Sequence, residues 1–325
     1  METFEQSLSK DLEQIEGMLK TCKDDNLRDI LNADKDTICE CLNLYNTPVN
    51  RSNSATYKEI KENILSNKIG YKTVSPIYML KQNKSIENKQ LFEEFIKKNE
   101  FGLRQVYENP NTCIFFSDVK FGELGYNIYI KSLNKNYIRV YSNNKINNYS
   151  VLVHELGHAK LNLAHLNAFE GHYNCNFSEA YPNFLKLMFL DFIKEQGRTK
   201  DSFNLKYSYL NQFVTLTEIL MEKLSSYSNY SSIEKSLFDY QYKLLMSDLL
   251  TMYLYNLYKK DKGECLRVLN IYINNFGLVS DNEFLKLMNI NPNNFKNLRI
   301  VSEFVNNLNN ERYIIKHKSN SKLTK

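Results

Sequence analysis

The stretch that decides the fold is Val151-Leu152-Val153-His154-Glu155-Leu156-Gly157-His158-Ala159, an apolar run that carries two histidines and a glutamate. Residues four apart lie on the same face of a helix, so the imidazoles of His154 and His158 can reach one metal ion. A buried helix tolerates such polar side chains only when they have partners. The spacing therefore predicts a buried metal-binding helix, with Ser150 as a candidate N-terminal cap.

Glu155 lies about 100° around this helix from His154, where it can meet a metal-bound water without ligating the metal itself. Zinc lowers the pKa of such a water toward about 7, and a nearby carboxylate can accept its proton. The HExxH pattern thus predicts one Zn²⁺ per chain and hydrolysis of peptide bonds, with Glu155 as general base. The alternative is a solvated helix whose histidines and glutamate bind no metal.

The pattern downstream of the two histidines excludes one class of zinc protease. A metzincin would need a glycine three residues after His158 and a histidine three further on, but Leu161 and Ala164 stand there. His165 lies two helical turns beyond His158, about 10 Å along the axis, which is too far for a shared metal. His172 is expected to lie in a loop or next to the metal ligands. It is only a secondary candidate for a ligand itself.

Glu179 is the preferred third zinc ligand. It opens the next predicted helix, which has Pro182 in its first turn and an apolar stripe that begins at Phe184. An antiparallel pair of helices would return its carboxylate to the two histidines. The alternative is a first-turn glutamate that only complements the helix dipole.

The remaining sequence favours a mainly α protein. Only 10 glycines and 5 prolines occur in 325 residues, too few for the turns of a many-stranded barrel or sandwich. Helices are predicted over 2–47 (two), 56–66 and 88–107, and again from 150. Between them, the β-branched and aromatic runs at 113–116, 126–130 and 137–141 predict a small sheet of two or three strands. The strand at 137–142 is expected to offer a free edge to an extended peptide. We predict a helical region at 1–108, a catalytic domain at 109–310 and a basic tail at 311–325.

Composition limits the partners and the compartment. The formal net charge of +5 is small and dispersed, so nucleic acid is not expected as a partner. The first residues show no secretory signal, and the most apolar stretches are too short to span a bilayer. The six cysteines fit free thiols in a reducing cytosol. A cytoplasmic protein with a peptide substrate and no membrane partner is predicted, and the sequence leaves the oligomeric state open.

Two blocks of the sequence resemble the thimet oligopeptidase and oligoendopeptidase F family of zinc metallopeptidases. The first joins His154–His158 to Phe177-Ser178-Glu179-Ala180, and the second runs from Phe238 to Asp248 and on through Tyr258. The resemblance covers roughly 110–300. It implies helical lobes around a channel with zinc at its base. It also implies that a tyrosine hydroxyl, from Tyr242 or else Tyr240, polarises the scissile carbonyl.

The sequence departs from that family in three ways. No histidine lies just ahead of the tyrosine pair, Leu244 and Leu245 replace a glycine-containing turn, and family members are commonly longer at the N-terminal side. Two other functions therefore remain open. One is a short regulatory HExxH metallopeptidase that cleaves a protein such as a repressor, although such proteins usually lack the tyrosine segment. The other is a helical interaction protein with a catalytically inactive zinc site.

Overall fold

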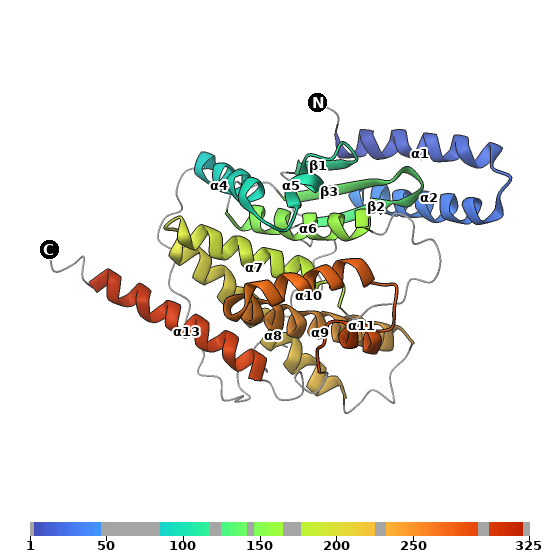
Figure 1. Ribbon diagram of the computed structural model, residues 1–325. Coiled ribbons are helices and arrows are strands. Elements are labelled where there is room, and N and C mark those ends of the chain that lie inside the picture. Colours follow the sequence, from blue (N-terminus) through green and yellow to red (C-terminus); the bar gives the residue numbers. More distant parts are fainter. Residues whose placement is uncertain are drawn as a thin grey trace. The chain divides into compact units, whose positions relative to one another are not determined.

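The computed structural model describes residues 3–46, 85–117, 125–141, 146–164, 177–224, 232–291 and 299–320 (Figure 1). These residues are mainly helical and contain one small sheet, which confirms the predicted fold class. The chain divides into two compact units. The first comprises Met1–Arg51 and Ile96–Asn167, and the second comprises Ser52–Phe95 and Ala168–Lys325. The helix predicted at 56–66 lies outside the described residues.

The first unit is a three-stranded sheet with helices on both faces. Its elements are α1 (Phe4–Thr21), α2 (Asp25–Asn46), α5 (Leu103–Tyr107), β1 (Thr112–Ser117), β2 (Gly125–Ile130), the 3₁₀ turn η1 (Lys131–Leu133), β3 (Lys135–Tyr141) and α6 (Ile146–Ala164). Asn134, in the left-handed conformation with φ 51°, lies between η1 and β3 and so completes the β2–β3 connection. Asparagine tolerates this conformation better than most residues, which is why the sequence predicted a turn here.

The strand order is β1-β3-β2, with β1 parallel and β2 antiparallel to β3. The prediction that the strand at 137–142 has a free edge is therefore wrong, because β3 is the middle strand. Among the described strands, β1 and β2 form the edges. The parallel pair joins β1 to β3, which are not consecutive strands. Local sequence patterns therefore could not predict this pairing.

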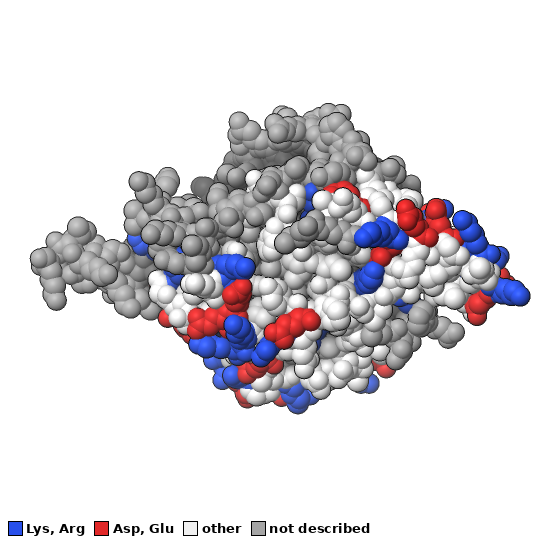
Figure 2. All heavy atoms as spheres, turned by 90° about the horizontal axis from the view of Figure 1, so that it is seen from above, with Lys and Arg blue, Asp and Glu red and all other residues white. Residues whose placement is uncertain are grey.

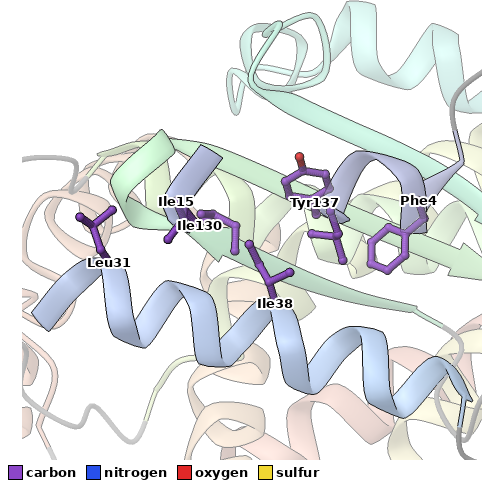
Figure 3. Close-up of a cluster of buried hydrophobic side chains, with 7 residues drawn as sticks. Phe4, Ile15, Leu31, Ile38, Ile130 and Tyr137 are labelled. Carbon is purple, nitrogen blue, oxygen red and sulfur yellow. The ribbon is translucent and has the colours of Figure 1, made fainter. Parts of the chain in front are cut away.

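The α1–α2 pair covers one face of the sheet through a compact apolar cluster (Figure 3). Its fully enclosed members are Phe4, Leu8, Ile15, Leu31, Ile38, Ile130 and Tyr137. Polar contacts accompany this packing on the same face. Asp11 accepts hydrogen bonds from Lys135 Nζ (2.6 Å) and from the Tyr137 hydroxyl, and the Arg139 guanidinium lies 5.3 Å from the centre of the Phe4 ring. The N-terminal helices are thus integral to the sheet.

Helix α6 packs on β2 and β3 and begins earlier than the sequence suggested. Its first residue is Ile146, and the Asn148 side chain donates a hydrogen bond to the carbonyl of Tyr141 at the end of β3. Ser150 is buried inside the helix, where its hydroxyl donates to the Asn147 carbonyl at 2.7 Å. The proposed Ser150 cap is therefore wrong, because the connection from the strand starts the helix one turn before it.

The second unit is helical throughout its described residues. It contains the greater part of α4 (Ser85–Lys98), then α7 (Ala180–Glu195), α8 (Thr199–Leu224), α9 (Ser232–Lys260), α10 (Lys262–Asn275), α11 (Asp281–Leu287) and α13 (Arg299–Asn320). Helix α7 packs against both α8 and α9. It is apolar on nearly all sides, as expected for a helix enclosed by others. None of the described helices is long and apolar enough to cross a membrane.

Buried charges connect four helices of this unit. Lys206 of α8 is fully buried and contacts Asp191 of α7 at 2.5 Å and Glu311 of α13 at 3.0 Å. Lys259 of α9 lies 2.5 Å from the second oxygen of Asp191, and the Tyr255 hydroxyl donates to the first at 3.0 Å. Pairing is what makes such burial tolerable. Residues 311–320, which the sequence assigned to a basic tail, continue α13, and Glu311 is buried in this network.

Charged side chains of both signs are interspersed over the described residues of the face in Figure 2. That pattern agrees with the small net charge of +5.

Candidate metal centre

His154 and His158 converge from successive turns of α6, as their spacing predicted. Their Nε2 atoms are 3.2 Å apart, and the two rings meet edge to face with centroids 4.9 Å apart. Two nitrogens bound to zinc at about 2.0–2.1 Å with a tetrahedral angle would stand about 3.3–3.4 Å apart. The imidazole pair is therefore already spaced as two ligands of one tetrahedral ion.

Helix α6 is tied to the sheet by a partly buried amide contact beyond the second histidine. Asn162 Nδ2 donates to the side-chain oxygens of Asn127 on β2 and Asn136 on β3, each at 2.9 Å. These contacts join the helix to two strands at once. They fix the position of α6 along its own axis, and therefore the positions of both imidazoles relative to the sheet.

Lys160, which departs from the usual apolar residue of the motif, also anchors α6. Its ammonium donates to the carbonyl of Phe101, just before α5. A side chain at Gly102 would approach the Lys160 nitrogen to 2.8 Å, so glycine leaves room for the contact. Burial lowers the pKa of Lys160 from its ordinary value. At this position, where the motif usually has an apolar residue that only packs, Lys160 satisfies a backbone carbonyl group.

Glu155 is 5% exposed and lies beside the first residue of β2. A Cβ added to Gly125 would stand 3.3 Å from Glu155 Oε1 and only 2.5 Å from Val151 Cγ1. Glycine is needed there for space, since real Cβ contacts are essentially never so short. No sequence motif assigned a role to Gly125. A glycine at the start of an otherwise β-branched and aromatic strand was the one available signal.

Glu179 occupies the N-cap position of α7, which confirms that it opens that helix. Its side chain makes no capping hydrogen bond, and its backbone N–H donates to Ser247 Oγ of α9 at 3.1 Å. A hydroxyl from another helix thus satisfies the N-cap N–H, which in a capping box would donate to the side chain at N3.

His154 and His158 belong to the first unit, and Glu179, the predicted third ligand, belongs to the second. Two imidazoles and one carboxylate form a donor set typical of catalytic zinc, which keeps a fourth position open. These three residues could therefore hold a metal ion. The rejected histidine His165 and the secondary candidate His172 lie outside the described residues.

A buried carboxyl lies next to the Glu179 segment. Asp248 of α9 accepts hydrogen bonds from the Tyr209 hydroxyl at 2.7 Å and from Asn183 Nδ2 at 3.2 Å. Burial raises the pKa of Asp248 from 3.8 to about 7, and the negative charge of Glu179 adds to the increase, while the hydrogen bond from Tyr209 opposes it. The sequence assigned no role to this aspartate, because its environment depends on α7 and α8.

Tyr240 and Tyr242 both belong to α9, the helix that also carries Ser247 and Asp248. Their side chains are 56% and 42% exposed, so core packing does not explain either of them. Their assignment as hydroxyl donors stays a prediction.

Comparison with known proteins supports the fold. Neither a protein-family model nor a curated protein matches the sequence. Among solved structures, the chain is similar to a Bacillus anthracis protein assigned as oligoendopeptidase F, with a TM-score of 0.53 and 15% identity over 90% of this chain and 64% of that one. It is also similar to a further structure assigned as oligoendopeptidase F (TM-score 0.50, 15% identity, 83% and 59% covered) and to PZ peptidase A solved with an inhibitor (0.50, 13%, 78% and 54%).

The chain thus spans less than two thirds of the length of each of these structures. At such low identities the similarity concerns the fold. Over most of its length, the chain has the fold of oligoendopeptidase F and PZ peptidase A.

Proposed function

We propose that this protein is a zinc-dependent metalloendopeptidase that hydrolyses peptides or oligopeptides, as a short and divergent relative of the thimet oligopeptidase and oligoendopeptidase F family. The observation that carries the proposal is the 3.2 Å separation of the Nε2 atoms of His154 and His158 on one face of α6. Glu155 follows directly after His154 on the same helix. The fold shared with peptidases supports the same function.

In this proposal His154, His158 and Glu179 bind one zinc ion. Bound zinc would supply Lewis acidity and lower the pKa of a water at its open position. The Glu155 carboxylate accepts a proton from the attacking water and delivers it to the leaving amine. A hydroxyl of Tyr240 or Tyr242 donates a hydrogen bond to the oxygen that gains negative charge.

We further propose that the peptide pairs with strand β2. Among the described strands, β2 pairs only with β3, so its other edge is available for backbone hydrogen bonds. The first residue of β2, Gly125, lies beside Glu155. A peptide on this edge would present its backbone next to the general base, largely independently of its side chains.

Zinc content and hydrolysis of a quenched peptide, measured together on the full chain, test the proposal. Glu155→Gln should keep zinc and lose activity by about two to four decades, because only the proton acceptor is removed. His158→Ala should lose zinc. Glu179→Ala should lower zinc affinity severely, whereas His172→Ala should cost at most about 10–100-fold.

Glu13→Gln, an exposed position on α1, is the matched control and should change neither quantity. Near-normal hydrolysis by Glu155→Gln would exclude Glu155 as the base. Stoichiometric zinc in His158→Ala would disprove the ligand assignment. Zinc binding without hydrolysis by the wild type would leave an inactive zinc-binding protein.

A further inference from the structure

The chain segment around Glu179 is held by side chains from two later helices. Glu179 N–H donates to Ser247 Oγ at 3.1 Å, and Thr251 Oγ1 donates to the Ala180 carbonyl at 3.1 Å. Just before the helix, the Tyr272 hydroxyl of α10 donates to the Phe177 carbonyl. Three backbone groups within four residues are therefore fixed from outside α7.

The two α9 hydroxyls lie in a buried environment where hydrogen bonds matter most. Ser247 and Thr251 are both 0% exposed. They are four residues apart, so they lie on one face of α9. The single O–H of Thr251 is shared between the Ala180 carbonyl and the Ser247 carbonyl, which lies 2.8 Å from Oγ1. A buried hydrogen-bonding group that loses its partner incurs the full cost of desolvation. The contact therefore holds the start of α7 in one position relative to α9.

This arrangement matters for the carboxylate of Glu179. Its side chain has three rotatable bonds. A carboxylate oxygen that binds zinc must lie about 2.0–2.2 Å from the ion, so it must be placed to within about tenths of an ångström. The backbone is held on both sides of the Glu179 Cα, at the Glu179 N–H and at the carbonyl of Ala180. These contacts restrict the positions that the carboxylate can reach. We propose that Ser247 and Thr251 are positioning residues that hold Glu179 ready to bind the metal. The inference rests on the proposed zinc site, though not on peptidase activity.

A purely structural role for the two hydroxyls makes a different prediction. If they only join α9 to α7, their loss lowers stability and leaves the zinc affinity of the folded protein unchanged. If they position Glu179, zinc affinity falls in protein that is still folded. The two readouts therefore have to be measured on the same variants.

The experiment titrates full-length protein with zinc alone, against a competing chelator, and measures urea unfolding separately in the presence of excess chelator. Ser247→Ala and Thr251→Val should each weaken zinc binding about 10-fold, the lower end for groups that orient a ligand. Thr251→Val keeps the shape of the side chain and removes the hydroxyl. Thr251→Ser restores the hydroxyl and should bind zinc within about twofold of the wild type.

Ser202→Ala is the matched control. Ser202 is also 0% exposed and in the same unit, and its hydroxyl has no hydrogen-bond partner. Its loss should leave zinc affinity unchanged. Wild-type zinc affinity in both Ser247→Ala and Thr251→Val would overturn the inference, whatever happens to stability. If Ser247→Ala fails to fold, the zinc affinities of Thr251→Val and Thr251→Ser test the inference on their own.

Glu179→Ala separates this inference from the function it rests on. Unchanged zinc binding in that variant would overturn both the ligand assignment and the positioning role. If the wild type binds zinc through Glu179 and hydrolyses no peptide, the peptidase proposal fails and the positioning inference stands on the affinities.

Discussion

Glu155 illustrates how much a single residue depends on its immediate neighbours. Its carboxylate is nearly enclosed, and the space it occupies is bounded by a glycine, not by a side chain that could move aside. A buried carboxylate is costly, so the structure around it must be adapted to hold it. At this scale Gly125 is as informative as the motif itself.

Gly125→Ala should impair activity through Glu155. The added methyl group would stand 2.5 Å from Val151 and 3.3 Å from the Glu155 carboxylate, so both must shift. Overpacking of this kind typically costs about 1–3 kcal/mol of stability. A displacement on the order of 1 Å can cost about 100-fold in rate. Urea unfolding and steady-state hydrolysis measure the two effects.

The double variant Gly125→Ala with Val151→Ala removes the shorter contact and keeps the one with Glu155. It should regain much of the stability while kcat stays low. Wild-type kcat in the double variant, compared with Val151→Ala alone, would show that Gly125 serves only the packing of Val151.

At the scale of elements, helix α9 combines the residues that contact the start of α7 with the two exposed tyrosines. Tyr240 precedes Ser247 by seven residues and Thr251 by eleven, which places it within about 20° of both around the helix. Tyr242 lies about 200° from Tyr240, on the opposite side of α9. The resemblance favoured Tyr242, whereas the helical phase favours Tyr240, which shares a face with the residues around Glu179.

Tyr240→Phe should therefore reduce kcat more than Tyr242→Phe, with little change in KM. One donor to a developing oxyanion is typically worth about 2.7–4 kcal/mol, which corresponds to about 100–1,000-fold in kcat. Steady-state kinetics of both variants on one peptide substrate measure the difference. The opposite ranking would restore Tyr242, and unchanged kcat in both would remove the tyrosines from the mechanism.

At the scale of the whole molecule, Asp248 couples folding to pH. Its pKa is about 7 in the folded, metal-free protein and about 3.8 when it is exposed to water. Between these values the folded state keeps a proton that the unfolded state has lost. The free energy of unfolding contributed by this group therefore falls as pH rises from about 4 to about 7, and is constant above that range.

Asp248→Asn should remove this dependence. The amide oxygen can still accept hydrogen bonds from Tyr209 and Asn183, while the group that ionises unfavourably is gone. The stability of the variant relative to wild type should rise between pH 5 and pH 8, as measured by urea unfolding in excess chelator. Asp29→Asn, at an exposed site on α2, controls for the loss of a carboxylate. Parallel pH curves for Asp248→Asn and wild type would contradict the prediction.

The sequence by itself determined the features that depend on neighbours a few residues apart. The spacing of His154 and His158 fixes two imidazoles on one helical face, and the 3.2 Å separation of their Nε2 atoms agrees with it. The short runs of β-branched and aromatic residues predicted a small sheet of two or three strands where β1, β2 and β3 lie, and Glu179 opens α7 as its surroundings indicated. Helical and strand periodicities are local, so they can be read without knowledge of the fold.

Only the tertiary structure decided which segments meet. It placed β3 in the middle of the sheet, started α6 before Ser150, and put Gly125 beside Glu155. It also brought Ser247 and Thr251 to the backbone around Glu179, across about 70 residues of sequence. These contacts arise from the pairing of strands and the packing of apolar helix faces, which are satisfied for the molecule as a whole. No local pattern specifies them, because the same serine or glycine would suit many other partners.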